Sequence, residues 1–244
     1  MTVFGEFIIF NFSIFTNLPK IGKRFLEIIK QMKRFGYDSL LLISVTSAFT
    51  GLVTSVQASY QTSGYIPKNL IGVLVGKSTM IELAPVLTGL VLAGKIGASI
   101  AAEIGTMKVS EQIDALKTMA INPQDFIYFP RIIAGCLMFP LLTIYANLIG
   151  IFSAYFLSTF KYNINSFSFF NNMKNYFLPS DLWGGLVKAF FFGWIITSIA
   201  CFVGNKTKGG AEGVGKAATQ TVVYSSIMVL ILDFIVASLL FGNI

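Results

Sequence analysis

The sequence contains no histidine, and only 11 of its 244 residues are acidic. Histidine and carboxylate side chains supply most general bases and metal ligands in proteins. The two cysteines, Cys136 and Cys201, lie inside apolar runs, where a thiol packs as a small hydrophobic group. We therefore expect no enzyme activity, no metal site, no cofactor and no disulfide framework in this chain.

Charged residues are also scarce, at 12% of the chain, whereas 55% is hydrophobic and the mean hydropathy is +0.73. A water-exposed globule of this length needs more polar surface than that. The net charge of +7 comes from lysines and arginines that flank apolar runs, which favours a membrane protein over nucleic-acid binding. The composition predicts an all-α integral membrane protein with a single membrane domain over residues 1–244.

Five runs have the ~20 mostly apolar residues that a helix needs to cross a bilayer. They are Leu40–Tyr60, Leu83–Ala102 with Lys95 inside it, Ile132–Phe160, Leu182–Val203 with Lys188 near its start, and Ala217–Leu240 with Asp233 inside it. We assign residues 39–244 to the transmembrane region and residues 1–38 to an N-terminal interfacial region. Met1 to Phe15 is apolar without the basic start of a signal peptide, so we expect it to be retained.

An odd number of spans places the two termini on opposite sides, and basic residues favour the cytoplasmic side. With the N-terminus inside, the cytoplasmic set is the larger one: Lys20, Lys23, Arg24, Lys30, Lys33, Arg34, Lys108, Lys117, Arg131, Lys206, Lys208 and Lys216. The outer set is Lys68, Lys77, Lys161, Lys174 and Lys188. This bias predicts a cytoplasmic N-terminus and a C-terminus outside.

An amphipathic segment precedes the first span. Its apolar residues recur at helical spacing and its basic residues occupy other faces: Ile21, Phe25, Ile28, Ile29 and Met32 against Lys23, Arg24, Lys30, Lys33 and Arg34. This pattern is typical of a helix that lies in the membrane interface. A basic tether beside the membrane, with no further role, is the alternative.

Small residues form a stripe along the second span, with Gly89, Ala93, Gly97, Ala101 and Gly105 at four-residue intervals. Such a face lets helix backbones approach closely in lipid, either inside one subunit or at a moving or dimeric interface.

Two charges accompany the stripe, Lys95 and Glu103. An eight-residue spacing separates them by ~12 Å along a helix, too far for a direct ion pair. An intramembrane charge indicates a polar element in a substrate path or gate, or else a lysine that binds carbonyl groups of a neighbouring helix.

The loop between the second and third spans reads IGTMKVSEQIDALKTMAINP from Ile104 to Pro123. Ser110 is the predicted N-cap of a short helix that Asn122 and Pro123 end. Ile113, Leu116 and Ala120 share one face, and Glu111, Gln112, Asp114 and Lys117 occupy the rest. Such a helix would suit a lever through which an ATPase moves membrane helices, although an ordinary surface helix has the same pattern.

One short motif, GVLVGKS from Gly72 to Ser78, resembles a phosphate-binding P-loop. It has three residues between its glycines where the motif needs four, and no strand-and-helix context surrounds it. Any ATP must therefore be hydrolysed by another chain.

The stretch from Glu82 to Pro130, which begins ELAPVLTGLVLAGKIGASIAAEIG, resembles the signature region of MlaE-family permeases, also called YrbE-like. The run GGAEGVGKAATQTVVYSSIMVLILDFIVASLLFGN, from Gly209 to Asn243, resembles the same family. The resemblance implies a homodimeric permease of an ABC transporter, with five membrane helices per subunit. It also implies transport of phospholipids or related lipids between the inner membrane and a periplasmic MCE-domain carrier, powered by a separate cytoplasmic ATPase.

The resemblance also implies roles for individual residues. Ser110, Glu111, Gln112, Asp114 and Lys117 would form the coupling helix against the ATPase, and Gln57, Tyr65, Lys95 and Glu103 would line the lipid path or gate. The sequence departs from many relatives at Ile81 and at Lys95, where arginine is common, and a lysine cannot make a planar bidentate contact with phosphate. An inner membrane is the expected location, with a plastid inner envelope as an alternative.

Two other functions are compatible with the residues. An ion-coupled secondary transporter would use Lys95, Glu103 and Asp233 as intramembrane charges and would need no ATPase. A structural membrane scaffold would depend on neither lipid nor nucleotide.

Overall fold

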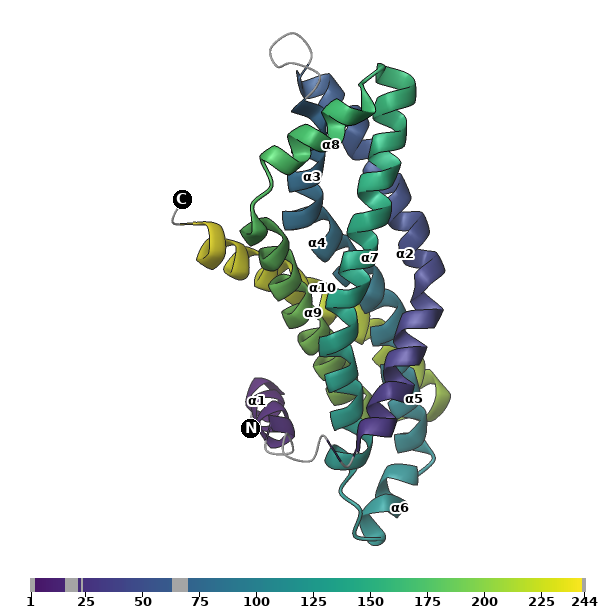
Figure 1. Ribbon diagram of the computed structural model, residues 1–244. Helices are drawn as coiled ribbons and strands as arrows, with labels where there is room; N and C mark the ends of the chain where they lie inside the picture. Colours follow the sequence, from purple (N-terminus) through teal and green to yellow (C-terminus); the bar gives the residue numbers. More distant parts are fainter. Residues whose placement is uncertain (1–2, 16–21, 23, 63–69, 243–244) are drawn as a thin grey trace.

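The computed structural model describes residues 3–15, 22, 24–62 and 70–242, and the regular structure in these ranges is entirely helical (Figure 1). Five helices are long and apolar enough to cross a membrane, as predicted. They are α2 (Phe25–Thr62), the continuous helix Ile71–Val109, the helix Gln124–Tyr162 that contains α7 (Phe129–Tyr162), α9 (Pro179–Asn205) and α10 (Gly210–Phe241). The helix Ile71–Val109 consists of α3 (Ile71–Ser78), α4 (Ala84–Leu92) and α5 (Ala98–Val109).

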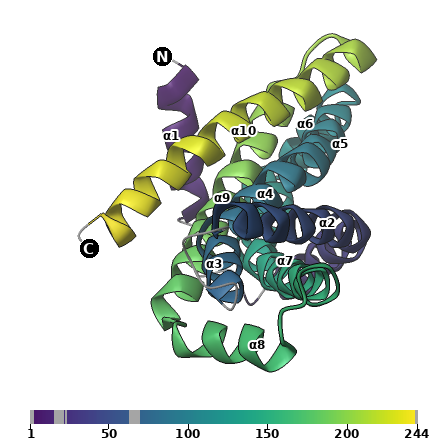
Figure 2. The same cartoon turned by 90° about the horizontal axis from the view of Figure 1, so that it is seen from above.

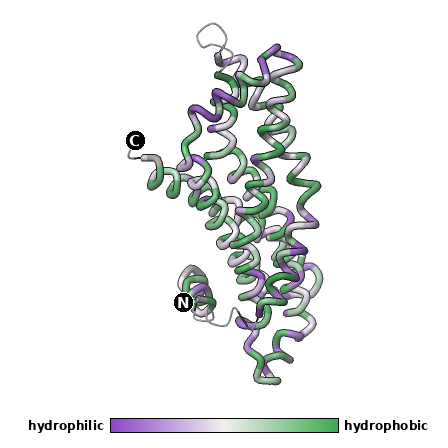
Figure 3. Tube along the Cα trace, viewed as in Figure 1, coloured by the Kyte–Doolittle hydropathy of each residue, from purple (hydrophilic) through white to green (hydrophobic). Residues whose placement is uncertain are grey.

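Three shorter helices lie outside the spans: α1 (Val3–Phe15), α6 (Gln112–Thr118) and α8 (Ser166–Asn175). Helices α6 and α8 lie at opposite ends of the bundle (Figure 1). Viewed along the bundle, α1 is seen lengthwise and so lies crosswise to the spans, near α9 and α10 (Figure 2). Hydrophilic residues gather at α8 and toward the end that holds α6, and apolar residues fill the length between (Figure 3).

The predicted amphipathic segment is helical, but it runs without a break into the first span as the start of α2. Its apolar face is divided, because Ile28 is buried in the core whereas Phe25 is 58% exposed. Ile21 and Lys23 lie outside the described residues. The separate crosswise helix is α1, which the apolar run Met1 to Phe15 supplies.

Helix α1 is attached to the bundle by aromatic contacts and one ion pair. The Phe7 and Phe202 rings lie 5.3 Å apart, and the Phe10 and Tyr128 rings 5.4 Å apart. Glu6 forms an ion pair with Lys206 at the end of α9, and this hydrogen-bonded ammonium group lowers the pKa of the Glu6 carboxyl below its ordinary value. The other face of α1 is apolar and open, with Phe12 71% exposed.

Three π turns interrupt the spans, at Thr79–Leu83, Ala93–Gly97 and Gln124–Tyr128. Two of them precede a proline, which lacks the N–H that an α-helix needs. Before Pro85, the N–H of Ala84 donates to the carbonyl of Thr79, five residues back. Single π turns inside helices are frequent at functional sites.

The glycine stripe of the second span packs inside the subunit. A Cβ atom would meet the Phe192 ring at Gly89, Ile196 at Gly97 and Thr207 at Gly105, each within 3.2 Å. Of the two readings of the stripe, the structure therefore supports close internal packing against α9 and α10. The adjacent Gly94 is exposed, and a Cβ atom there would meet nothing within 4 Å.

The closest backbone approach between α2 and α7 generates a stability prediction. A Cβ atom at Gly51 would lie 2.0 Å from the carbonyl oxygen of Gly150, whereas a Cβ at Gly150 would meet its nearest neighbour, Thr79, at an ordinary 3.4 Å. We expect Gly51→Ala to lower the stability by about 1–3 kcal/mol, because backbone cannot move aside as a side chain can. Gly150→Ala is the matched control and should be neutral or stabilising, since alanine favours a helix.

The measurement is the Tm of each purified variant in the same detergent and lipid. Equal Tm values for Gly51→Ala and Gly150→Ala would contradict the close packing of α2 on α7.

Candidate functional site

A buried lysine joins the second, fourth and fifth spans. Lys188 of α9 has no exposed side-chain surface. Its ammonium nitrogen lies 2.5 Å from a carboxylate oxygen of Glu82 and 3.0 Å from one of Asp233. Glu82 belongs to the π turn Thr79–Leu83 and Asp233 to α10. Because an unpaired charge is costly in lipid, this cluster fixes the second, fourth and fifth spans to one another.

This cluster corrects one part of the charge count. Lys188 was assigned to an outer segment, but its side chain is enclosed between helices and paired with two carboxylates. Lys188 therefore does not indicate which end of the bundle faces the cytoplasm. The remaining basic residues keep the same bias.

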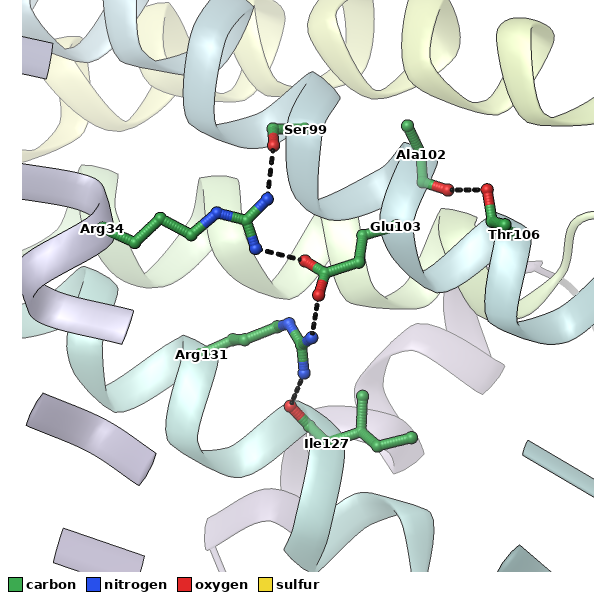
Figure 4. Close-up of polar contacts among 7 residues, drawn as sticks. All are labelled: Arg34, Ser99, Ala102, Glu103, Thr106, Ile127 and Arg131. Atoms are coloured by element: carbon green, nitrogen blue, oxygen red, sulfur yellow. Dashed lines mark hydrogen bonds and ion pairs between the residues drawn. The ribbon is translucent and has the colours of Figure 1, made fainter. Parts of the chain in front are cut away.

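A second cluster lies around Glu103 of α5 (Figure 4). Arg34 of α2 donates to one Glu103 oxygen at 2.7 Å, and Arg131 of α7 donates to the other at 2.8 Å. Arg34 also donates to the hydroxyl of Ser99, and Arg131 to the carbonyl of Ile127 at 2.7 Å. A carboxylate between two guanidinium groups forms charge-assisted hydrogen bonds on both oxygens, so Glu103 connects α2, α5 and α7.

The structure does not bring Lys95, Glu103 and Asp233 together. Glu103 pairs with two arginines and Asp233 with Lys188, in separate clusters. Lys95 lies half-buried in the π turn Ala93–Gly97, and the described residues offer it no ion-pair partner. The three charges that an ion-coupled transporter would use therefore form no common site.

Glu82, Arg34 and Arg131 are central to these clusters but were not singled out from the sequence. The sequence could have indicated them, because a charge in one span that has an opposite charge in another span is a candidate for an ion pair. Gln57 is exposed on α2. It lines a shallow apolar groove together with Val53, Val56 and Tyr60 of the same helix. Tyr65 lies outside the described residues.

The predicted loop helix is α6, held firmly at one end of the bundle. Ile113 is fully buried in the core, and Leu116 packs against that core. Asp114 accepts from Lys108 at the end of α5 and from Lys117 of α6, both at 2.8 Å. These hydrogen bonds lower the pKa of the Asp114 carboxyl to about 2. Glu111, Gln112 and Lys117 remain exposed on the outer face of α6.

The predicted ends of this helix are wrong in detail. Ser110 is not its N-cap: it ends α5, and its hydroxyl donates to the carbonyl of Thr106 at 2.8 Å. Glu111 follows with φ 59°, which turns the chain sharply into α6. At the other end α6 stops at Thr118, and the Asn122 side chain instead accepts from the backbone N–H of Gln124.

Five apolar spans, charges paired inside them, and a short helix anchored at one end define an integral membrane protein that crosses the bilayer several times. The comparison with known families agrees: residues 28–239 match the family described as Permease MlaE, and the chain belongs to this family.

Similar proteins come from bacteria and from a plant. A probable ABC transporter permease protein of Rickettsia bellii is 39% identical over 237 residues, 97% of this chain and 92% of that protein. The intermembrane phospholipid transport system permease protein MlaE of Haemophilus influenzae is 37% identical over 225 residues, 92% of this chain and 86% of that protein. The chloroplastic protein TRIGALACTOSYLDIACYLGLYCEROL 1 of Arabidopsis thaliana is 36% identical over 213 residues, 87% of this chain and 61% of that protein.

The Lys188 cluster generates the next prediction. Lys188→Met would leave Glu82 and Asp233 without a cation. Removal of one partner from a fully buried pair costs roughly 3–5 kcal/mol, and the cost here is smaller than that because the Glu82 side chain is 42% exposed. We expect a large drop in Tm, and recovery of most of it when Glu82→Gln and Asp233→Asn are added, because the neutral trio buries no charge. Lys174→Met, at an exposed lysine of α8, is the matched control. A Lys188→Met variant that melts like the wild type would refute the assigned role.

The Asp114 contacts generate a separate prediction about α6. Asp114→Asn should raise hydrogen–deuterium exchange across residues 112–119, since the clamp to Lys108 is lost, and Glu111→Gln should leave exchange unchanged.

A lowered folded-state pKa stabilises the clamp above the ordinary value of 3.8, and that contribution is lost only as pH falls through about 2. Protection of α6, corrected for intrinsic exchange, should therefore be the same at pH 6 and pH 8. A clear difference between these two pH values would contradict an ionised Asp114 as the group that holds α6.

Proposed function

We propose that this chain is the membrane subunit of an ABC transporter that moves phospholipids or related lipids between the inner membrane and a periplasmic MCE-type carrier. In this proposal the single membrane domain, residues 1–244, has no enzyme activity and binds no cofactor of its own. A separate cytoplasmic ATPase hydrolyses the ATP. The relatives named as ABC transporter permeases, and the one named for intermembrane phospholipid transport, support this assignment.

The observation that carries the proposal is the attachment of α6. An ATPase can move membrane helices only through a segment that is rigid and connected to them. Ile113 in the core and the Lys108–Asp114 ion pair fix α6 to α5. Helix α5 in turn carries Glu103, which binds arginines of α2 and α7. A push on the exposed Glu111, Gln112 and Lys117 would therefore reach three spans through hydrogen-bonded charges.

A homodimer is the assembly we infer for the membrane part. Helices α2 and α10 carry large exposed apolar side chains, among them Phe49 at 65% and Phe234 at 74%. Gly94 lies open on the helix between them (Figure 2), so a second copy could approach its backbone closely. The lipid path would then run along this face, past Lys95 and the exposed Gln57, with the Glu103 cluster as a gate at its inner end.

The orientation follows from the basic residues. The end of the bundle that holds α6 also carries Arg24, Lys108, Lys117 and Lys206, which favours the cytoplasm for this end. We infer a cytoplasmic N-terminus and an external C-terminus, in a bacterial inner membrane or a plastid inner envelope.

The proposal is tested by charge reversal on the exposed face of α6. We expect Glu111→Lys to uncouple ATP hydrolysis from lipid movement, because it reverses the charge presented to the ATPase and leaves the Asp114 clamp intact. The measurement compares ATP hydrolysis and ATP-dependent transfer of fluorescent phospholipid in proteoliposomes that contain the co-purified complex. Lys174→Glu, at the opposite end of the bundle, is the control and should transfer lipid at the wild-type rate. Unchanged transfer by Glu111→Lys would count against α6 as the lever.

A further inference from the structure

A cavity of about 700 Å³ opens between α1, the end of α9 and the first half of α10. It is separate from the Lys188 and Glu103 clusters, and none of their residues lines it. Its walls are apolar and come from three helices: Phe7, Ile199, Phe202, Ala217, Ile227 and Met228. A volume in the range of roughly 300–1,000 Å³ is typical of small-molecule sites, so one ligand of moderate size fits.

The rim of this cavity is basic. Lys206, Lys208 and Lys216 line it together with the polar side chains of Thr207 and Gln220. Lys206 pairs with Glu6, and Lys216 lies 2.6 Å from Glu212, so three cations face two carboxylates. The described residues offer Lys208 no ion-pair partner. Exposed ion pairs such as Lys216–Glu212 contribute little stability, so an entering anion can compete for these lysines.

The cavity lies at the end of the bundle where α9 ends and α10 begins, beside helix α1. Helix α1 lies crosswise to the spans (Figure 2). Its Phe7 side chain forms one wall of the cavity. Its outward residues Ile8, Ile9 and Phe12 are more than half exposed, as expected for a helix embedded in the membrane interface. The lysines lie where α9 ends and α10 begins, and the apolar walls lie along the helices. A ligand there would place its charge at the rim and its apolar part among the walls.

We propose that this cavity binds one anionic phospholipid from the leaflet that faces α6, with the phosphate group at Lys208 and Lys206 and an acyl chain against Phe202 and Ile227. Basic pockets between membrane helices on the cytoplasmic side recognise acidic lipid headgroups in this way. The site deepens the proposed function and rests on it, since it would hold lipid on the side opposite to the carrier. A zwitterionic lipid has no net negative charge to pair with Lys208, so the site should prefer an anionic lipid.

The test measures lipid binding without ATP, so that it does not depend on transport. The full chain, with the proteins that co-purify with it, is placed in nanodiscs of equal parts phosphatidylethanolamine and phosphatidylglycerol, and retained lipids are counted by native mass spectrometry. We expect phosphatidylglycerol to be retained in preference. Lys208→Gln should lower that preference about fivefold, the effect of one lysine near an anionic lipid. Lys174→Gln, at an exposed lysine of α8, should leave it unchanged.

A second pair of variants tests the apolar walls. Ile227→Trp fills the cavity from α10, whereas Ile231→Trp adds the same side chain one turn further along, at a position that does not line it. Both residues are about half exposed, so both variants should fold, and their Tm values confirm this. Ile227→Trp should lose the retained phosphatidylglycerol, and Ile231→Trp should keep it.

Three results would overturn the proposal. Equal retention of both lipids by the wild type would remove the anionic selectivity. Retention that survives both Lys208→Gln and Ile227→Trp would place the lipid elsewhere. Displacement of the lipid by millimolar inorganic phosphate would show that the lysines bind phosphate and that the apolar walls do not contribute to binding. Failure of ATP-dependent transfer with this binding intact would instead contradict the proposed function alone.

Discussion

A charge held among membrane-spanning helices must be paired within the protein, and this constraint organises the whole bundle. Lys188 meets it with carboxylates from the second and fifth spans, and Glu103 meets it with arginines from the first and third. Together the two clusters involve every span. The helix Ile71–Val109 is the element they share, because Glu82 lies toward one end of it and Glu103 toward the other. Any displacement of this helix must be accompanied by its charge partners.

The spans could be predicted from the sequence because their signal is local: a run of apolar residues long enough to cross a bilayer carries its own hydrogen bonds. The partners of the intramembrane charges could not, because Glu82, Lys188 and Asp233 meet only after three helices pack. The same limit applies to the glycine stripe, whose pattern suits an internal or an external contact equally well. Its contacts with Phe192 and Ile196 distinguish the two.

The errors at α6 and α1 have different physical origins. Ser110 has the composition of an N-cap, but the left-handed turn at Glu111 shifts the start of α6 and leaves the Ser110 hydroxyl to bind the preceding helix. Helix α1 shows no amphipathic pattern of its own, since its residues are apolar around most of the helix. Its place is set by Phe202 and Tyr128, which come from other parts of the chain. The spacing of Lys95 and Glu103 predicts no direct ion pair between them, and Glu103 pairs instead with Arg34 and Arg131.

The π turns give the second span a mechanical property that a regular helix lacks. Each one holds an extra residue in its turn, and one residue covers about 100° of an α-helix. When that extra residue passes to the next position, the segment beyond it rotates about its own axis and keeps its hydrogen bonds. Helix α4 lies between two such turns, at Thr79–Leu83 and Ala93–Gly97. A shift of the extra residue at either turn would therefore change the direction in which the α4 side chains face relative to α3 and α5.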